Sequence, residues 1–237
     1  MKTPPIALII TVSLVIAVGQ AGFAGPAATE ATGQEKEDPK IEALLKKPSP
    51  LSLADQEALG KAVFAKLSAA SDDAKPEFFE RYYKVVMDRC PDTNRAHESY
   101  WRLTNLYTQA YDDPKSAEIV KILEQFLARY KASTIVSMKK YPDEPLIFSP
   151  LKSLHHAYED LGQYAKVAAY YDRTAPSQEA AFAIYDYFDY ASALDKTGRV
   201  KDAVLWYEKF LKKTQGNEDV DFMREIAEDR VKELKKK

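Results

Sequence analysis

The sequence predicts an all-α fold built from stacked helical hairpins, and three observations support this fold class. A pattern of apolar and small residues occurs twice with an offset of 36 residues, so that Gly162 falls on Gly198. Apolar residues three and four positions apart lie on both sides of each glycine, which is the spacing of one helix face. The chain has 15 tyrosines and only 8 glycines, which favours helices packed through large aromatic side chains.

Each copy of the pattern is predicted to be two helices joined by a tight turn. Glycine adopts, at little cost, the positive φ at which many helices end, so Gly162 and Gly198 mark the turns. Small residues in the second helix, such as Ala203, let the two helices of a copy approach closely. One hairpin cannot bury its apolar face alone, so the hairpins at 150–184 and 186–215 are expected to stack on each other and on further helices.

Segments before the two clear copies continue the pattern in weaker form. A degenerate copy at 96–131 keeps the apolar spacing of the clear copies, but Tyr111 takes the place of the glycine. The segment from Pro76 is predicted to be the second helix of a still earlier hairpin, and Cys90 and Pro91 end it, because proline cannot continue a helix.

The two ends of the repeat region carry signals of their own. Ser52 followed by Asp55 resembles a capping box, so a helix is predicted to begin there. The segment 217–236 has one apolar stripe and an otherwise charged surface. It is predicted to be a C-terminal capping helix that covers the exposed end of the stack.

The two copies share a motif that resembles tetratricopeptide repeats (TPR). It reads A-Y-x-x-x-G-x-Y-x-x-[small]-x-x-Y-Y from Ala157 to Tyr171 and A-L-x-x-x-G-x-V-x-x-A-x-x-W-Y from Ala193 to Tyr207. The resemblance implies a right-handed α-solenoid whose concave face, lined by the first helix of each hairpin, binds peptides or partner proteins. The run 82–107 is also similar to the hairpin-to-hairpin joint of bacterial envelope repeat proteins, of the Tol-Pal-associated cell-division coordinator and outer-membrane assembly lipoprotein types.

The N-terminus, residues 1–24, is predicted to be a signal peptide. Lys2 gives a positive start, positions 6–18 form an apolar run, and small residues up to Ala24 offer a cleavage site. A membrane-spanning helix needs about 20 apolar residues, which favours cleavage; an uncleaved anchor in the inner membrane is the alternative. The prediction is an exported, periplasmic protein with no integral membrane span in its mature chain.

The amino-acid composition predicts a disordered linker before the folded domain. Residues 25–50 are polar and small without an apolar period, so they are predicted to be a disordered linker before a repeat domain at 51–237. Cys90 is the single cysteine, so the chain has no intramolecular disulfide and no cysteine after the apolar run to carry a lipid.

Motifs for catalysis or cofactor binding are not found, so the sequence predicts a protein that is not an enzyme and needs no cofactor. The strongest metal candidate is the helical set His155, His156, Glu159 and Asp160, and a solvated or groove-facing cluster is favoured over a metal. His155 aligns with Ala191, where tetratricopeptide repeats usually have a small residue; it is either a local deviation or a residue that opens toward the groove. The net charge of −2 argues against a nucleic-acid partner.

The function expected from the resemblance is an exported scaffold or adaptor that binds peptides or envelope proteins through the concave face. The alternative is a non-catalytic accessory subunit of an envelope enzyme complex that binds a glycan or peptide. The segment 131–150, which breaks the period with prolines, is either a plain connection or a ligand-contacting strand of chain. Carrying the groove positions of the family onto this sequence gives nine candidate residues: Trp101, Asn105, Thr108, Lys152, His156, Glu159, Phe188, Ser192 and Asp195.

Overall fold

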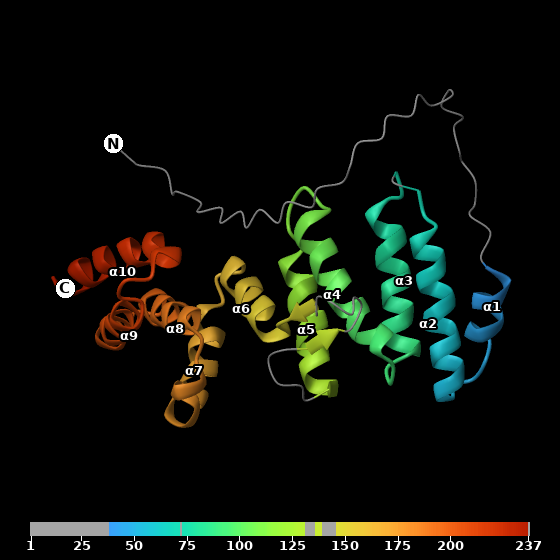
Figure 1. Ribbon diagram of the computed structural model, residues 1–237, viewed down its shortest axis with the longest axis horizontal. Helices are drawn as coiled ribbons and strands as arrows, with labels where there is room; N and C mark the ends of the chain where they lie inside the picture. Colours follow the sequence, from blue (N-terminus) through green and yellow to red (C-terminus); the bar gives the residue numbers. More distant parts are fainter. Residues whose placement is uncertain (1–37, 72, 131–135, 139–145, 237) are drawn as a thin grey trace. The chain divides into compact units, whose positions relative to one another are not determined.

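The computed structural model describes residues 38–71, 73–130, 136–138 and 146–236 (Figure 1). Within these ranges the fold is all-α apart from one short hairpin of strands, with α-helices α1 to α10 that pack mainly against their neighbours in sequence. The predicted signal peptide and most of the predicted linker lie outside the described residues. None of the helices in the described ranges is long and apolar enough to cross a bilayer.

The first helix lies where the sequence predicted a disordered linker. Helix α1 (Pro39–Leu45) begins at Asp38, whose carboxylate accepts a hydrogen bond from the Lys40 amide at 2.8 Å. Ile41 and Leu44 are buried, and the helix packs against α2. Two apolar residues three positions apart behind an N-cap and a proline are a helix signal, and the polar composition around them concealed it.

Helix α2 (Leu53–Ser68) begins as predicted. The Ser52 hydroxyl accepts from the Asp55 amide at 3.2 Å and donates to the Asp55 carboxylate at 2.9 Å. Helix α3 (Pro76–Arg89) ends at Cys90, also as predicted. Helices α4 (Asn94–Gln109) and α5 (Ser116–Tyr130) form the pair expected from the degenerate copy, and the turn between them lacks a glycine.

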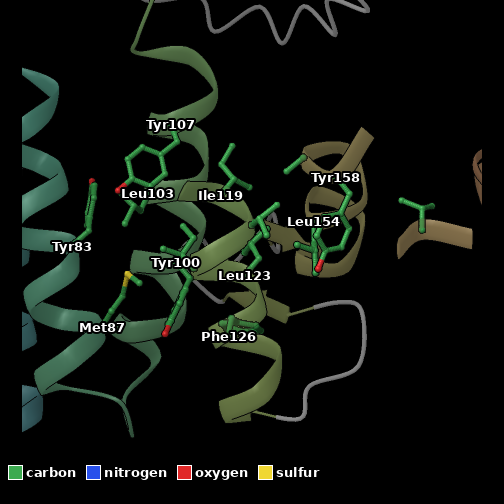
Figure 2. Close-up of a cluster of buried hydrophobic side chains, with 14 of the residues drawn as sticks. Tyr83, Met87, Tyr100, Leu103, Tyr107, Ile119, Leu123, Phe126, Leu154 and Tyr158 are labelled. Carbon is green, nitrogen blue, oxygen red and sulfur yellow. The ribbon is translucent and has the colours of Figure 1, made fainter. Parts of the chain in front are cut away.

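A continuous apolar cluster joins these helices to the clear repeats. Figure 2 shows Tyr83 and Met87 of α3 facing side chains of α4, and α5 inserting Leu123 between α4 and the next helix. Tyr100 and Phe126 meet edge to face, with ring centroids 5.0 Å apart, an arrangement that aromatic quadrupoles favour. The core is therefore continuous from one helix pair to the next.

The connecting segment after α5 contains two strands that the sequence did not predict. Strand β1 (Val136–Met138) pairs antiparallel with β2 (Leu146–Phe148), with Val136 opposite Phe148. The strands fall inside the proline-containing segment 131–150, where the helical period breaks. Three-residue strands carry too little alternation to be recognised from sequence.

The two clear copies form the hairpins α6 (Pro150–Asp160) with α7 (Tyr164–Gln178), and α8 (Ile184–Lys196) with α9 (Val200–Lys213). Gly162 and Gly198 have φ of 68° and 78°, as predicted. The two turns close with the same backbone bond: the amide after the glycine donates to the carbonyl of Tyr158 at 2.7 Å in one and of Leu194 at 2.9 Å in the other. This is the Schellman arrangement of helix C-termini.

Aromatic and ionic contacts hold the two hairpins together. Tyr171 of α7 stacks on Tyr190 of α8 with ring centroids 5.1 Å apart, and its hydroxyl donates to Asp186 at 3.0 Å. Asp172 of α7 accepts from Tyr190 and forms an ion pair with Arg199 at 2.7 Å. Tyr171, the second of the paired tyrosines in the motif, therefore joins one repeat to the next.

Short 3₁₀ turns lead into the last elements. η1 (Glu179–Ala181) precedes α8, and η2 (Glu218–Val220) precedes α10 (Asp221–Leu234). Helix α10 packs on α9 with Ala227 and Leu234 buried, which is the packing expected of the C-terminal cap.

Candidate binding face of helices α6 and α8

All nine predicted groove residues lie on the first helix of a pair, namely α4, α6 or α8. Their surroundings differ. The α4 residues are separated from α6 by α5, which packs against both helices. The α6 and α8 residues, by contrast, belong to successive clear repeats and include groups whose charges interact.

The α4 candidates are engaged within their own part of the fold. Trp101 is partly buried against the core, and the Arg102 guanidinium lies 5.3 Å from its ring centroid. Thr108 donates its hydroxyl to the Thr104 carbonyl of the preceding turn at 2.9 Å. Asn105 is partly exposed. Arg102 and Thr104 both belong to α4, so these two contacts lie within one helix.

Two of the three α8 candidates also make internal contacts. Phe188 packs edge to face against Tyr207 and Phe210 of α9, with centroids 5.7 and 5.3 Å apart. Asp195 accepts two hydrogen bonds from Arg230 of α10, at 2.8 and 2.9 Å. Both side chains therefore stabilise the end of the stack, and neither is free to meet a partner without loss of these contacts.

The α6 candidates form a row with positions i, i+4 and i+7, namely Lys152, His156 and Glu159, on one helix face. Lys152 places its ammonium 4.4 Å from the ring centroid of Tyr185 at the start of α8. Tyr185 is 42% exposed although it is a large aromatic residue. The two helices therefore present a lysine and a tyrosine together at the surface.

Two carboxyl groups between these helices hold protons more tightly than usual. Burial, and then the charges of Asp189 and Asp160, raise the pKa of Glu159 to about 8. Burial also raises the pKa of Asp189 to about 7, with Lys152 opposing the shift and Asp186 adding to it. Burial stabilises the neutral form of an acid, and at Asp189 the charge of Lys152 offsets this only in part. Near neutral pH the pair therefore does not carry its full negative charge.

Tyr185 and Asp189 were missed by sequence reasoning. They lie four residues apart on α8, and Ser192 follows three residues later on the same helix face. These residues form the row that faces Lys152 and Glu159 of α6. Projecting the same groove positions onto both copies selected Phe188 and Asp195 instead. A repeated sequence pattern identifies residues at the same position in each copy. Two stacked helices, however, contact each other through residues at different positions of the two copies.

The side chains of the two consecutive histidines of α6 lie in different environments. His155 is buried, with its ring 4.8 Å from that of Tyr170 and 5.3 Å from that of Tyr171. Burial, and then the charge of His156, lower the pKa of His155 to about 4, so the imidazole is neutral at physiological pH. Asp160 accepts a hydrogen bond from Ser116 of α5 at 2.9 Å. Among the described residues no three His, Cys, Asp or Glu side chains are grouped as metal ligands would be.

Comparison with known proteins adds no family assignment. No family model matches the chain, and no curated protein matches it significantly.

Proposed function

We propose that the protein is a TPR-like scaffold that binds a protein or peptide partner through the α6–α8 face, defined by Lys152, His156, Glu159, Tyr185 and Asp189. One observation carries this proposal: on successive first helices, polar and aromatic side chains remain exposed or half-buried, while the other faces of these helices are used in packing. An exposed aromatic residue surrounded by charged groups is the composition of binding hot spots.

The chemistry of the face favours a partner segment with a basic residue. A lysine or arginine placed beside Glu159 and Asp189 would stabilise their carboxylates and lower both raised pKa values. Binding would then release protons, and affinity would increase with pH up to about 8, where Glu159 ionises without help. Tyr185 would supply the apolar contact beside this charged position.

The proposed setting is the periplasm, with an envelope protein as the partner. This part of the proposal rests on the apolar run at positions 6–18 and the small residues after it. Expression with the native N-terminus, followed by mass measurement of the mature chain, tests it. A mass that corresponds to loss of about the first 24 residues supports export, and an intact N-terminus in the membrane fraction supports the anchor instead.

The binding test uses crosslinking in the cell followed by mass spectrometry. The variant Lys152→Ala/His156→Ala/Tyr185→Ala removes the exposed part of the face and keeps its buried carboxyls. The matched control is Lys201→Ala/Leu205→Ala/Lys212→Ala, three exposed residues of α9. Specific partners should be lost in the first variant and kept in the control. Equal recovery from both variants, with both folded, would show that this face is not the binding site.

A glycan ligand is the second candidate, favoured by the exposed ring of Tyr185 beside carboxyl groups. Sugars stack on aromatic faces and donate hydrogen bonds to carboxylates. A Tyr185→Trp variant would report such stacking by its fluorescence. A saturable change with a saccharide in the absence of any protein partner would favour the accessory-subunit function over the adaptor.

A further inference from the structure

The hairpin α6–α7 contains a cleft. The larger part has a volume of about 610 Å³ and is bounded by α5, α6 and α7. A smaller part of about 360 Å³ adjoins it and shares Leu151, His155 and Tyr170 with it. A volume of this size is within the usual range for small-molecule sites.

One residue that lines both parts of the cleft distinguishes this repeat from the next. His155 lies at the position that Ala191 occupies in the next repeat, where the small side chain is fully buried and α8 packs closely on α9. The imidazole instead fills the interface between the helices and rests against Tyr170 and Tyr171. Consistent with this, α6 and α7 approach each other less closely than α8 and α9 do.

The lining of the larger part is apolar on its inner walls and cationic at one side. Leu127, Leu151 and Leu154 supply apolar surface, and Ala169 is exposed at the cleft. His155 is 3% exposed and lines both parts, and its imidazole forms no hydrogen bond to any residue that the structure describes. A buried imidazole without a partner can donate or accept one hydrogen bond from a ligand.

Two cations, Lys166 and Arg173, border the larger part of the cleft, and Lys152 borders the smaller part. Lys166 already pairs with Glu124 at 3.3 Å and lies 4.5 Å from the centroid of the Tyr158 ring. Arg173 is exposed and makes neither an ion pair nor a hydrogen bond within the described ranges. The acid of the smaller part, Asp186, is engaged by the Tyr171 hydroxyl at 3.0 Å and the Ala183 amide at 2.7 Å. The free charge at the cleft is therefore positive.

We propose that the cleft between α6 and α7 binds a small amphiphilic carboxylate. Its aliphatic or aromatic body lies along the leucines and Tyr170, and its carboxylate meets Arg173, whose planar guanidinium suits bidentate binding of a carboxylate. His155 supplies the one hydrogen bond inside the apolar part. The smaller part of the cleft shares Lys152 with the α6–α8 face, but the contact proposed at Arg173 does not depend on the partner proposed for that face.

Calorimetric titration of the full mature chain with submicellar decanoate tests the proposal, with decanol as the uncharged probe. Two variants change exposed residues, so that folding is preserved: Arg173→Glu reverses the free charge, and Ala169→Phe fills the cleft. Lys201→Glu, an equally exposed charge reversal on α9, is the matched control. Thermal melts confirm that all of the variants are folded.

The expected result is saturable binding of one decanoate per chain, more tightly than decanol. Arg173→Glu should weaken decanoate binding about tenfold, the size of effect expected for one charged hydrogen-bonded contact. Ala169→Phe should abolish binding, and Lys201→Glu should leave it unchanged. Absent or non-saturable binding to the wild type, or binding that survives Ala169→Phe, overturns the site. Equal affinity for decanol and decanoate, unaffected by Arg173→Glu, overturns the carboxylate assignment.

Discussion

Individual side chains of α6 and α8 make the stability of this protein depend on pH, because burial shifts the pKa values of two carboxyl groups and a histidine. The most shifted carboxyl is that of Glu159, whose pKa is raised from 4.5 to about 8 in the folded chain. In the unfolded chain the same group loses its proton near its ordinary pKa. Between these two values the unfolded state binds fewer protons, so the free energy of unfolding falls as pH increases.

Glu159→Gln removes this effect while keeping the shape of the side chain. Relative to the wild type, the variant should gain stability as pH rises from about 5 to 8, with a difference on the order of 2 kcal/mol at the upper end and none near pH 4. Urea unfolding of both proteins at a series of pH values measures this difference. A gap that stays constant with pH would contradict the assignment.

His155 produces the opposite slope in acid. Its pKa is lowered from 6.5 to about 4, so the unfolded chain takes up a proton in this interval and the folded chain does not. The free energy of unfolding should therefore fall as pH decreases from about 6.5 to 4. Proton NMR of the imidazole in the folded protein should give a midpoint near 4, and His155→Phe should lose this part of the stability profile. A midpoint near 6.5 would show that the ring is solvated.

At the residue scale, prediction from sequence succeeded for local signals and failed for contacts between repeats. Ser52 and Asp55 form the predicted cap because both partners lie within one turn of the chain. Lys152, His156 and Glu159 lie on one face of α6, as expected from their spacing, and their role in binding stays a prediction. Tyr185 and Asp189 were missed because the offset between stacked helices depends on the volume of the side chains between them.

At the scale of single elements, the glycine turns test the repeat most directly. Gly162 and Gly198 have positive φ, and a Cβ added at either one would meet no atom within 4 Å. An alanine at either position would therefore destabilise the fold only because it must adopt a left-handed backbone conformation. This costs about 1 kcal/mol of unfolding free energy for each substitution.

Gly162→Ala and Gly198→Ala should each lower the free energy of unfolding by this amount, measured by denaturant titration. Asparagine tolerates the left-handed region better, so Gly162→Asn should lose less. If alanine proves harmless at both positions, the turns do not have the conformation described here.

Helices with a strong apolar period and clear end signals were predicted from the sequence. Elements that lack these signals were not predicted. The hairpins at 150–184 and 186–215 were found because each supplies two full helix faces and a glycine. Helix α1 was missed because one helical turn of apolar pattern is easily hidden by polar neighbours. Strands β1 and β2 were missed because three residues each do not establish a period of two.

At the scale of the whole molecule, stability depends on contacts that pass from each helix pair to the next and end at α10. Arg230 connects this last helix to α8 through the Asp195 carboxylate, whose side chain is 9% exposed. Removing the guanidinium leaves a largely buried carboxylate unpaired, which is more costly than losing a surface ion pair.

Arg230→Ala should therefore lower the free energy of unfolding by about 2 kcal/mol. Lys232→Ala is a suitable control, because Lys232 and its partner Asp229 are both exposed and such pairs contribute little. Thermal or denaturant unfolding of the two variants compares them. Equal effects would mean that α10 is not held to the stack through Asp195.

Binding of a partner at the α6–α8 face can be tested in the cell. A photoreactive amino acid at position 185 of the natively exported chain tests it most directly, with the same group at position 205 on α9 as the comparison, since both side chains are exposed. Light should capture a defined envelope protein from position 185 and not from position 205. Capture from position 205 alone, or the same proteins from both positions, would contradict it.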